Sequence, residues 1–253
     1  MRKRTTYEVV PVASVAGELT HLRGFSEAWF CLTNQGQVLT TPEGIPIAHP
    51  SRPLLEGMRA EALSRAGLRL AFLSLYSMFC TMRDHVEPER TEGGSCKYLV
   101  LGDLTLRLCA GPEAGDQLAY LGPIEDFFSE NHLPRLQLSQ SGDASHQEQS
   151  LIAAGCEPQM NTLVDFFETL WPTLSPAQQC VVTTCVHIHG VFILGILLAQ
   201  SRCDPAEYAD ALLALDCLIP GVFGVSQREA ARYRKQIATD AMVMARFRDL
   251  AEG

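Results

Sequence analysis

The chain has 253 residues, of which 47% are hydrophobic and 19% are charged, a composition typical of a globular protein with a sizeable core. This length allows one large domain or two of modest size. The formal net charge of −9 disfavours binding to the phosphate backbone of nucleic acids, since that affinity comes largely from Lys and Arg. We therefore expect no nucleic-acid partner.

The nine cysteines occur singly in mostly apolar surroundings, and no CxxC pair is present. This usage is typical of buried thiols in a reducing compartment rather than of a disulfide framework. The basic start MRKR continues into TTYEVV without an apolar segment, so we expect no secretory signal. The longest apolar run is short, which disfavours insertion into a membrane. We expect a soluble protein of the bacterial cytoplasm, with the mitochondrial matrix as the alternative.

The first 134 residues predict a β-rich domain on which helices pack. Turn sequences at Asn34-Gln35-Gly36 and Pro42-Glu43-Gly44 separate short apolar segments, so strands are expected at 7–12, 28–33, 37–41 and 45–48. Ser51 then begins a helix as its N-cap, with Pro53 in the first turn. A second helix, apolar on most faces, is expected at 68–82, followed by a polar loop at 87–94.

The rest of this domain predicts one more strand and one more helix. Leucines alternate with polar residues within 98–109, which is the period of a half-buried strand. A helix is expected at 112–132, bent or restarted at Gly122-Pro123. Residues 135–150 are rich in Ser, Gln, Gly and Asp, and this composition indicates a linker.

Residues 151–253 predict an all-α domain, so the fold class is α+β with a β-rich N-terminal domain followed by a helical bundle. A helix from Pro158 is expected to end at Trp171-Pro172. Three more helices begin with capping boxes, in which a cap side chain and a residue three positions later bond each other's backbone: Ser175 with Gln178, Asp204 with Glu207, and Ser226 with Glu229.

The helix predicted at 176–200 is apolar on every side between Val191 and Ala199, which indicates the core of the bundle. On the last helix an inward stripe is expected, formed by Ala230, Tyr233, Ile237, Ala241 and Met244. Its other face contains four cations, Arg228, Arg232, Arg234 and Lys235. Residues 151–225 hold seven acidic residues and one basic, so these cations are either solvated or docked on the acidic bundle or a partner.

Four possible metal ligands lie within ten positions, namely Cys180, Cys185, His187 and His189. On a continuous helix His187 and His189 point about 200° apart, so they cannot bind one ion. We therefore expect histidines at a packing face and no metal. A metal- or ligand-binding enzyme with a site near His187 and His189, between the domains, is the alternative.

No other pattern indicates catalysis. The chain contains no GxSxG, HExxH, P-loop or GxGxxG sequence, so no motif supports a hydrolase, zinc-protease or nucleotide-binding site. The neighbouring carboxylates Glu125 and Asp126 point about 100° apart on a helix and do not converge on one substrate atom. We expect a protein that is not an enzyme, with no catalytic residue and no cofactor.

Several segments are similar, in the same order, to those of a known family. They are VLTTPEGIPIAHPSRPLLEGMRAEA at 38–62, Asp103 with Arg107, Leu121-Gly122-Pro123, ILGILLAQSRCDPAEYADALLALD at 193–216, Val222-Phe223-Gly224, and ARFRDL at 245–250. Together they resemble the assembly chaperones of the F-type ATP synthase that hold the unassembled alpha subunit of its catalytic sector. Ala62, Leu121 and Phe223 stand where this family has tryptophan.

The resemblance implies a chaperone that binds the alpha subunit, prevents its aggregation, and releases it to the beta subunit without ATP. It implies partner contacts at Asp216, Phe223 and Gly224. Asp216 is the one residue left of an acidic cluster in the family, and Phe223 with Gly224 matches the family's Trp-Gly pair. An adaptor of the same fold with another protein client is a further alternative.

Overall fold

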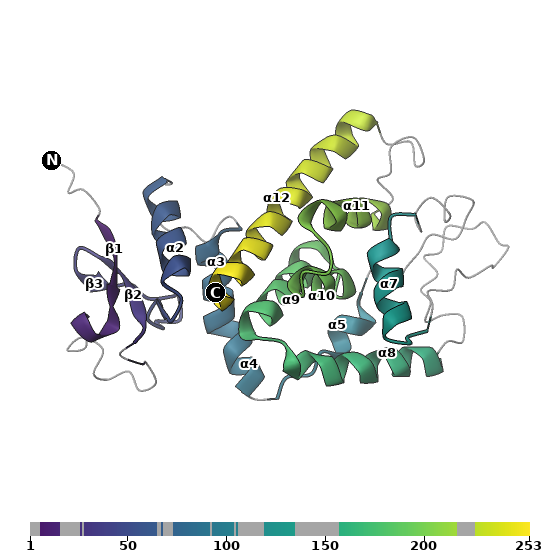
Figure 1. Ribbon diagram of the computed structural model, residues 1–253, viewed down its shortest axis with the longest axis horizontal. Coiled ribbons are helices and arrows are strands. Elements are labelled where there is room, and N and C mark those ends of the chain that lie inside the picture. The colour runs from purple at the N-terminus through teal and green to yellow at the C-terminus, as the bar shows by residue number, and fades with distance from the viewer. Residues whose placement is uncertain are drawn as a thin grey trace. The chain divides into compact units, whose positions relative to one another are not determined.

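The computed structural model describes 6–15, 26, 28–64, 67, 73–91, 93–103, 105, 119–134, 157–216 and 226–253, with side chains from 160 onward in the helix that begins at 157. The chain forms two compact units, Met1–Glu92 with Arg246–Gly253, and Gly93–Ala245 (Figure 1). A small antiparallel sheet lies in the first unit, and helices occur in both. The fold is therefore α+β, as predicted.

The sheet of the first unit has four strands in the described residues, all antiparallel to their neighbours. The strands are β1 (Tyr7–Pro11), β2 (Phe30–Asn34), β3 (Gln37–Val38) and β4 (Ala48–His49). Their order is β1-β2-β3, and β4 also pairs with β2. The first three predicted strands are confirmed, although β3 is shorter than expected, and β4 overlaps the strand predicted at 45–48 only at Ala48.

Both predicted turns are present beside β3. Gln35 and Gly36 have φ angles of 53° and 81°, the left-handed pair that a two-residue hairpin turn requires. At the second turn Gly44 has a φ of 83° and donates its N–H to the Thr41 carbonyl at 3.0 Å. Glycine suits these positions because it adopts positive φ without steric cost.

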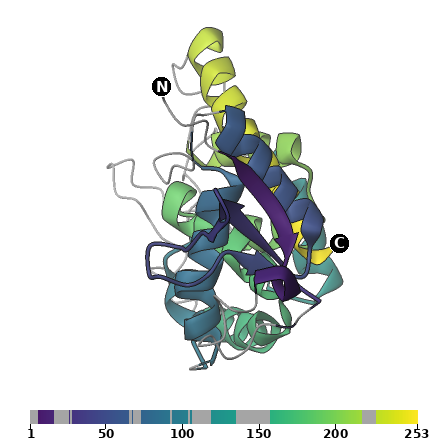
Figure 2. The same cartoon turned by 90° about the vertical axis from the view of Figure 1, so that its left-hand side faces the viewer.

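Helix α2 (Arg52–Ser64) packs beside β1, as Figure 2 shows. The Ser51 hydroxyl accepts the Leu54 N–H at 3.3 Å, which confirms the predicted N-cap. Leu54, Leu55 and Met58 are fully buried. A 3-10 turn at Val12–Val15 follows β1 and places Val12 in the small core behind the sheet.

The polar segment 87–94 is helical at its start, so the loop predicted there is wrong. Helix α3 (Leu75–Thr81), capped by Ser74, continues through a π-helical turn at Met82–Val86 into α4 (Glu87–Thr91). The Arg83 guanidinium pairs with the Glu87 carboxylate one turn later. This contact joins the two segments, and composition alone does not reveal it.

The second unit begins with α5 (Lys97–Leu101), where a strand had been predicted from residue 98. The strand prediction is wrong for 98–101, and the leucines whose alternation suggested a strand lie later in the segment, outside the described residues. Cys96 and Val100 are both fully buried and lie four residues apart, which places them on one helix face.

Helices α7 (Gly122–Glu130) and α8 (Glu157–Leu170) follow. Helix α7 begins at the predicted Gly-Pro restart, and a 3-10 turn at Trp171–Thr173 ends α8 as expected. Helix α5 packs on α8, and α7 packs on a core helix of the same unit. The described residues between 93 and 134 thus group with the second unit. The linker 135–150 lies outside the described residues, so the domain limits 1–134 and 151–253 stay a prediction.

The single helix predicted at 176–200 is in fact two, α9 (Pro176–His189) and α10 (Ile193–Ala199). Gly190 ends α9 with a φ of 70° and donates its N–H to the Val186 carbonyl at 2.9 Å, a common way for a helix to stop. All of α10 is buried, which confirms it as the core of the bundle.

Helices α9 and α10 approach each other closely at Gly195. A Cβ atom there would lie 2.9 Å from Cys185 Cβ and 3.4 Å from Val182 Cα. We expect Gly195→Ala to lower the free energy of unfolding by about 1–3 kcal/mol, measured by urea denaturation, because the added methyl overpacks the core. Gly122→Ala is the matched control, since a Cβ there meets no atom within 4 Å. Equal stability of both variants would contradict this packing.

The last two helices are α11 (Pro205–Leu215) and α12 (Gln227–Glu252), and all three predicted capping boxes are present. Within the described ranges, no helix combines the length and apolar character that crossing a membrane requires. Tyr233 on α12 is 52% exposed, so its predicted inward position is wrong. The start of α12 buries almost none of its side chains, since between 226 and 236 only Ala230 is buried.

Candidate partner-binding site

A buried carboxylate holds the core helix α10 in place. Asp103 is 1% exposed and accepts the Ile193 N–H at 2.7 Å, at the start of α10. It also accepts the Thr105 N–H at 2.9 Å and the Thr105 hydroxyl at 2.7 Å. Burial raises the pKa of Asp103, although these hydrogen bonds oppose the rise. Asp103 is thus a cap supplied from a distant segment. Arg107, its companion in the resemblance, lies outside the described residues.

Aromatic rings join α7, α8 and α10. The Phe167 ring lies 5.2 Å from that of Phe192, nearly perpendicular to it, and 6.2 Å from that of Phe127. On α7, the Phe127 ring also lies 4.9 Å below the Arg202 guanidinium, which pairs with Glu130. Burial of these rings holds α7, α8 and the start of α10 together.

The two histidines expected at a packing face have separate partners. His187 is exposed, and its Nδ1 lies 2.8 Å from the Thr183 carbonyl of its own helix. His189 is half-buried, and its Nδ1 lies 2.9 Å from the Tyr208 hydroxyl on α11. Desolvation lowers the pKa of His189, which favours the neutral ring. The structure does not bring these two side chains to a common point.

The nearby cysteines are packing residues. Cys180 and Cys185 are fully buried, and the Cys185 sulfur lies 3.5 Å from the Met244 sulfur on α12. Burial raises the pKa of Cys185 to about 12, so its thiol is protonated at neutral pH, whereas a metal ligand would be the thiolate. In the part of the chain that the structure describes, no three His, Cys, Asp or Glu side chains form a group that could hold a metal ion.

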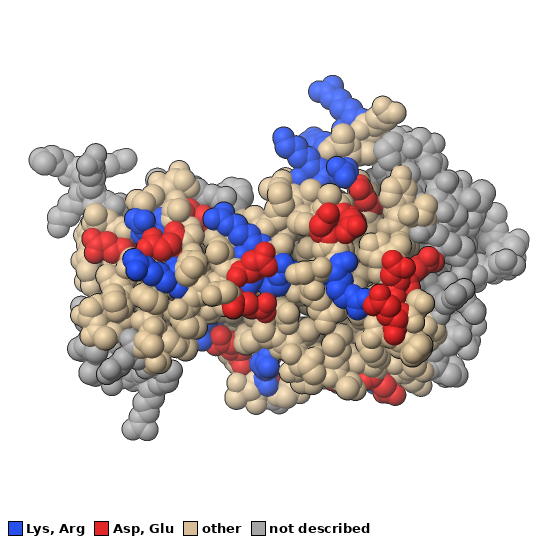
Figure 3. Space-filling model, in the orientation of Figure 1, with Lys and Arg blue, Asp and Glu red and all other residues tan. Residues whose placement is uncertain are grey.

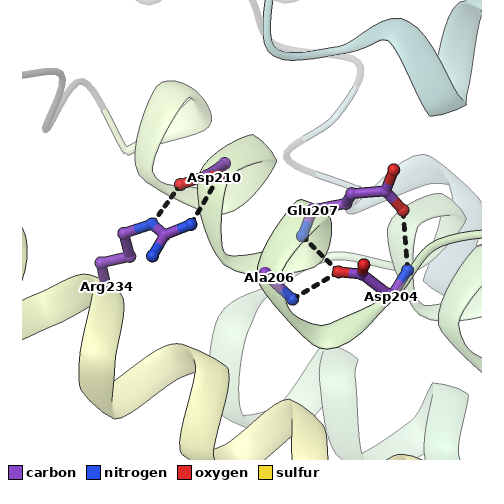
Figure 4. A network of polar contacts seen from close by, with 5 residues as sticks. All are labelled: Asp204, Ala206, Glu207, Asp210 and Arg234. Carbon is purple, nitrogen blue, oxygen red and sulfur yellow. Dashed lines mark hydrogen bonds and ion pairs between the residues drawn. The ribbon is translucent and has the colours of Figure 1, made fainter.

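The start of α11 is fixed by the network in Figure 4. The Asp204 carboxylate accepts the N–H groups of Ala206 at 2.7 Å and Glu207 at 2.8 Å, while the Glu207 carboxylate accepts the Asp204 N–H at 2.8 Å. One turn on, Asp210 accepts two hydrogen bonds from Arg234 of α12, at 2.5 and 2.9 Å. Arg234 therefore docks on the acidic bundle, one of the two roles expected for the cations of α12.

Asp216 lies at the other end of α11, as its C-cap. Its N–H donates to the Leu212 carbonyl, and its side chain is exposed. Its carboxylate makes no hydrogen bond or ion pair with any described residue. Nearby protein atoms partly desolvate the carboxylate, which raises the pKa of Asp216. The C-terminal end of a helix dipole is negative, so the negative charge of Asp216 is unfavourable there. Asp204, at the positive N-terminal end of the same helix, is favourably placed.

Of the three residues carried over from the resemblance, the structure places only Asp216. Phe223 and Gly224 lie outside the described residues, between the end of α11 and the start of α12. Sequence patterns did not predict the ion pair between Asp210 and Arg234. In the sequence α11 is acidic and the start of α12 is basic, which indicates that the two helices attract each other. It does not indicate which residues pair.

We expect Asp216→Asn to raise the free energy of unfolding by about 0.3–1 kcal/mol, because it removes a negative charge from the negative end of the helix dipole. Asp204→Ala, at the other end of the same helix, should lower this energy by about 1 kcal/mol through loss of the N-cap. Urea denaturation of both variants measures the contrast. A clear loss of stability in Asp216→Asn would show that the carboxylate has a stabilising partner.

Comparison with known proteins gives matches only at the level of structure. No protein-family model matches the chain, and no curated protein sequence matches it significantly. Atp12 from Paracoccus denitrificans has a TM-score of 0.66 and 17% identity, covering 99% of this chain and 97% of that one. A point mutant of the same Paracoccus protein, with 16% identity and the same coverage, has a TM-score of 0.67.

The Atu1473 protein of Agrobacterium tumefaciens has a TM-score of 0.63 and 19% identity, and the match covers 90% of this chain and 82% of that one. Identities this low support the fold and do not transfer an activity. The match with both Atp12 structures extends over nearly the whole chain, sheet and helices alike. The chain has the fold of Atp12.

Proposed function

We propose that this protein is an assembly chaperone that binds the unassembled alpha subunit of the F-type ATP synthase and prevents its aggregation before assembly with beta. The observation that supports this most is the Atp12 fold over 99% of the chain, because Atp12 is an ATP synthase assembly chaperone. The collinear segments of the sequence, from 38–62 to 245–250, point to the same family independently of the coordinates.

The replaced tryptophans are compatible with this function. Ala62 is 1% exposed and Leu121 is fully buried, so both replacements lie in the packed interior of their units and not on a surface open to a client. A change at such a position alters core packing first. The contacts proposed for the client remain Asp216, Phe223 and Gly224, of which Asp216 is exposed.

The charge at Asp216, which has no partner among the described residues, supports a contact with the client. A side chain that costs its own helix stability is expected where a protein trades stability for function. A basic group of the client could pair with this carboxylate and remove the unfavourable interaction with the helix end. Such pairing would stabilise the complex relative to the isolated protein, in which the carboxylate stays next to the negative end of the helix.

A chaperone of this kind needs no chemical step. It covers an apolar surface of the client that would otherwise associate with like subunits, and the beta subunit displaces it by competing for that surface. Binding must therefore be weak enough for the assembled subunits to be more stable. We propose no catalytic residue and no cofactor, and we place the protein in the bacterial cytoplasm or in a mitochondrial matrix.

The proposal is tested by light scattering of a purified alpha subunit under conditions in which it aggregates. We expect one equivalent of this protein to suppress the aggregation. An unrelated aggregating protein is the control, because a general holdase would protect both. Unchanged aggregation of the alpha subunit would contradict the proposal and favour an adaptor with another client. Stoichiometric zinc in the purified protein would instead favour the metal-binding alternative at His187 and His189.

The two-domain organisation belongs to this proposal as well. The predicted linker 135–150 separates domains 1–134 and 151–253, whereas the compact units divide between Glu92 and Gly93 and again between Ala245 and Arg246. Limited proteolysis distinguishes the two divisions. First cleavage within 135–150, followed by separation of the fragments, supports the predicted domains, while fragments that stay associated favour the compact units.

A further inference from the structure

The first turns of α12 present a row of cations on one side of the helix. Arg228, Arg232 and Lys235 are spaced by four and three residues, so they lie within about 60° of the helix circumference. All three are exposed, and Figure 3 shows Lys and Arg atoms gathered at this end of α12. We call these three residues the basic stripe.

The described residues provide no carboxylate that pairs with the basic stripe. The fourth cation of the segment, Arg234, points to Asp210. The only acidic residue in these turns, Glu229, bonds to the Ser226 hydroxyl and N–H as part of the helix cap. The preceding segment 217–225, CLIPGVFGV, contains no charged residue and cannot neutralise the stripe. Within the ranges that the structure describes, these cations thus have no carboxylate partner, although the chain as a whole has a net charge of −9.

The stripe has the composition of a protein interface. Arg is enriched among the residues that dominate binding energies at protein interfaces, and two of the three stripe residues are arginines. The stripe is only about 10 Å long, and it belongs to a chain whose formal net charge is −9. That overall charge would repel an extended phosphate backbone, whereas a local acidic patch can meet the stripe alone, so a protein surface fits better than a nucleic acid.

We propose that the basic stripe docks on an acidic surface of the client, the alpha subunit named above, and steers its association. This inference rests on the proposed function. Exposed charges at the edge of an interface act mainly on the association rate and on its dependence on salt. The stripe would thus bring the client to the protein, while apolar contacts elsewhere hold it.

The test compares two variants with the same loss of charge. Arg228→Gln with Arg232→Gln removes two cations of the stripe, and Gln keeps the helix propensity. Arg90→Gln with Lys97→Gln removes two exposed cations of α4 and α5. At low ionic strength, we expect the association rate with purified alpha subunit to fall about tenfold in the stripe variant only, and to depend less on salt. Equal rates in the two variants would overturn the inference.

A zero-length carbodiimide crosslink identifies the partner group. In the complex we expect Lys235 to form an amide with a carboxylate of the alpha subunit. Lys235→Arg is the control, since it keeps the charge and should keep the binding while losing the crosslink. A crosslink that does not involve Lys235, with binding unchanged in the stripe variant, would place the interface elsewhere.

The remaining outcomes are also decisive. If the unmodified protein does not bind the alpha subunit at all, the proposed function fails and this inference fails with it. If the protein binds a duplex or single-stranded oligonucleotide and the stripe variant does not, the stripe is a nucleic-acid site and the inference is overturned. The same holds if the stripe variant abolishes self-association measured by sedimentation, which would assign the stripe to a second copy of this chain.

Discussion

Asp103→Ala should lower the free energy of unfolding by about 3 kcal/mol, because it leaves the buried N–H groups of Ile193 and Thr105 and the Thr105 hydroxyl without their acceptor. The effect should exceed that of a surface substitution severalfold, since no water replaces the lost bonds at a site that is 1% exposed. Urea denaturation of the full chain measures it. A loss below about 0.5 kcal/mol would mean that another group caps α10.

The same residue gives a prediction about pH. Because burial raises the pKa of Asp103, the folded state holds a proton over a range in which the unfolded state has lost it. The contribution of Asp103 to stability should therefore decrease as pH rises from about 4, the usual pKa of Asp, through the raised value. Asp103→Asn removes this titration and keeps part of the hydrogen bonding. The stability of the unmodified protein relative to Asp103→Asn should fall over this pH range, and a rise would contradict the account.

Phe167→Ala should cost about 3–5 kcal/mol of unfolding free energy, the largest effect we expect for a single side chain. Phe167 is fully buried and contacts the rings of Phe127, Phe166 and Phe192, so its removal leaves a cavity between three helices. Its neighbour Phe166 is half-buried and contacts the rings of Phe127 and of Phe167 itself.

Phe166→Ala is thus the matched control for Phe167→Ala, with the same chemistry in the same turn of α8. We expect its cost to be at most half that of Phe167→Ala, because solvent already reaches the side chain. Urea denaturation of both variants measures the difference. Similar costs would mean that the two rings are equally buried in solution, contrary to the structure.

Local signals in the sequence were enough to predict most helix starts and turns. The capping boxes at Ser175, Asp204 and Ser226 each depend on residues within three positions, and all three are present. The turns at Gly36 and Gly44 are determined by positive φ angles that glycine adopts easily. Such features need no knowledge of distant contacts.

The errors occurred where distant contacts or the helix period decided the structure. A cap supplied across 90 residues, from Asp103 to Ile193, is invisible in a local window. The break at Gly190 was missed because the apolar pattern continues through it, so periodicity favoured one helix. From residue 98 a strand is predicted because leucines alternate further along the segment. The four-residue spacing of the buried Cys96 and Val100, which is typical of a helix, is the weaker signal in the sequence.

The candidate site depended on a different kind of inference. Helix geometry alone correctly separated His187 from His189, and the structure gives them different partners. Nothing in the local pattern singles out Asp216, which was named only from the resemblance. The structure adds a physical reason to examine it, namely an exposed carboxylate at the negative end of α11.

The claim that this protein is an alpha-subunit assembly chaperone is tested most directly by titrating purified alpha subunit with it, then adding beta subunit in the absence of ATP. We predict a saturable stoichiometric complex that beta displaces without nucleotide, since beta competes for the surface that the chaperone covers. No complex with the alpha subunit, or a complex that beta releases only when ATP is present, would contradict this account.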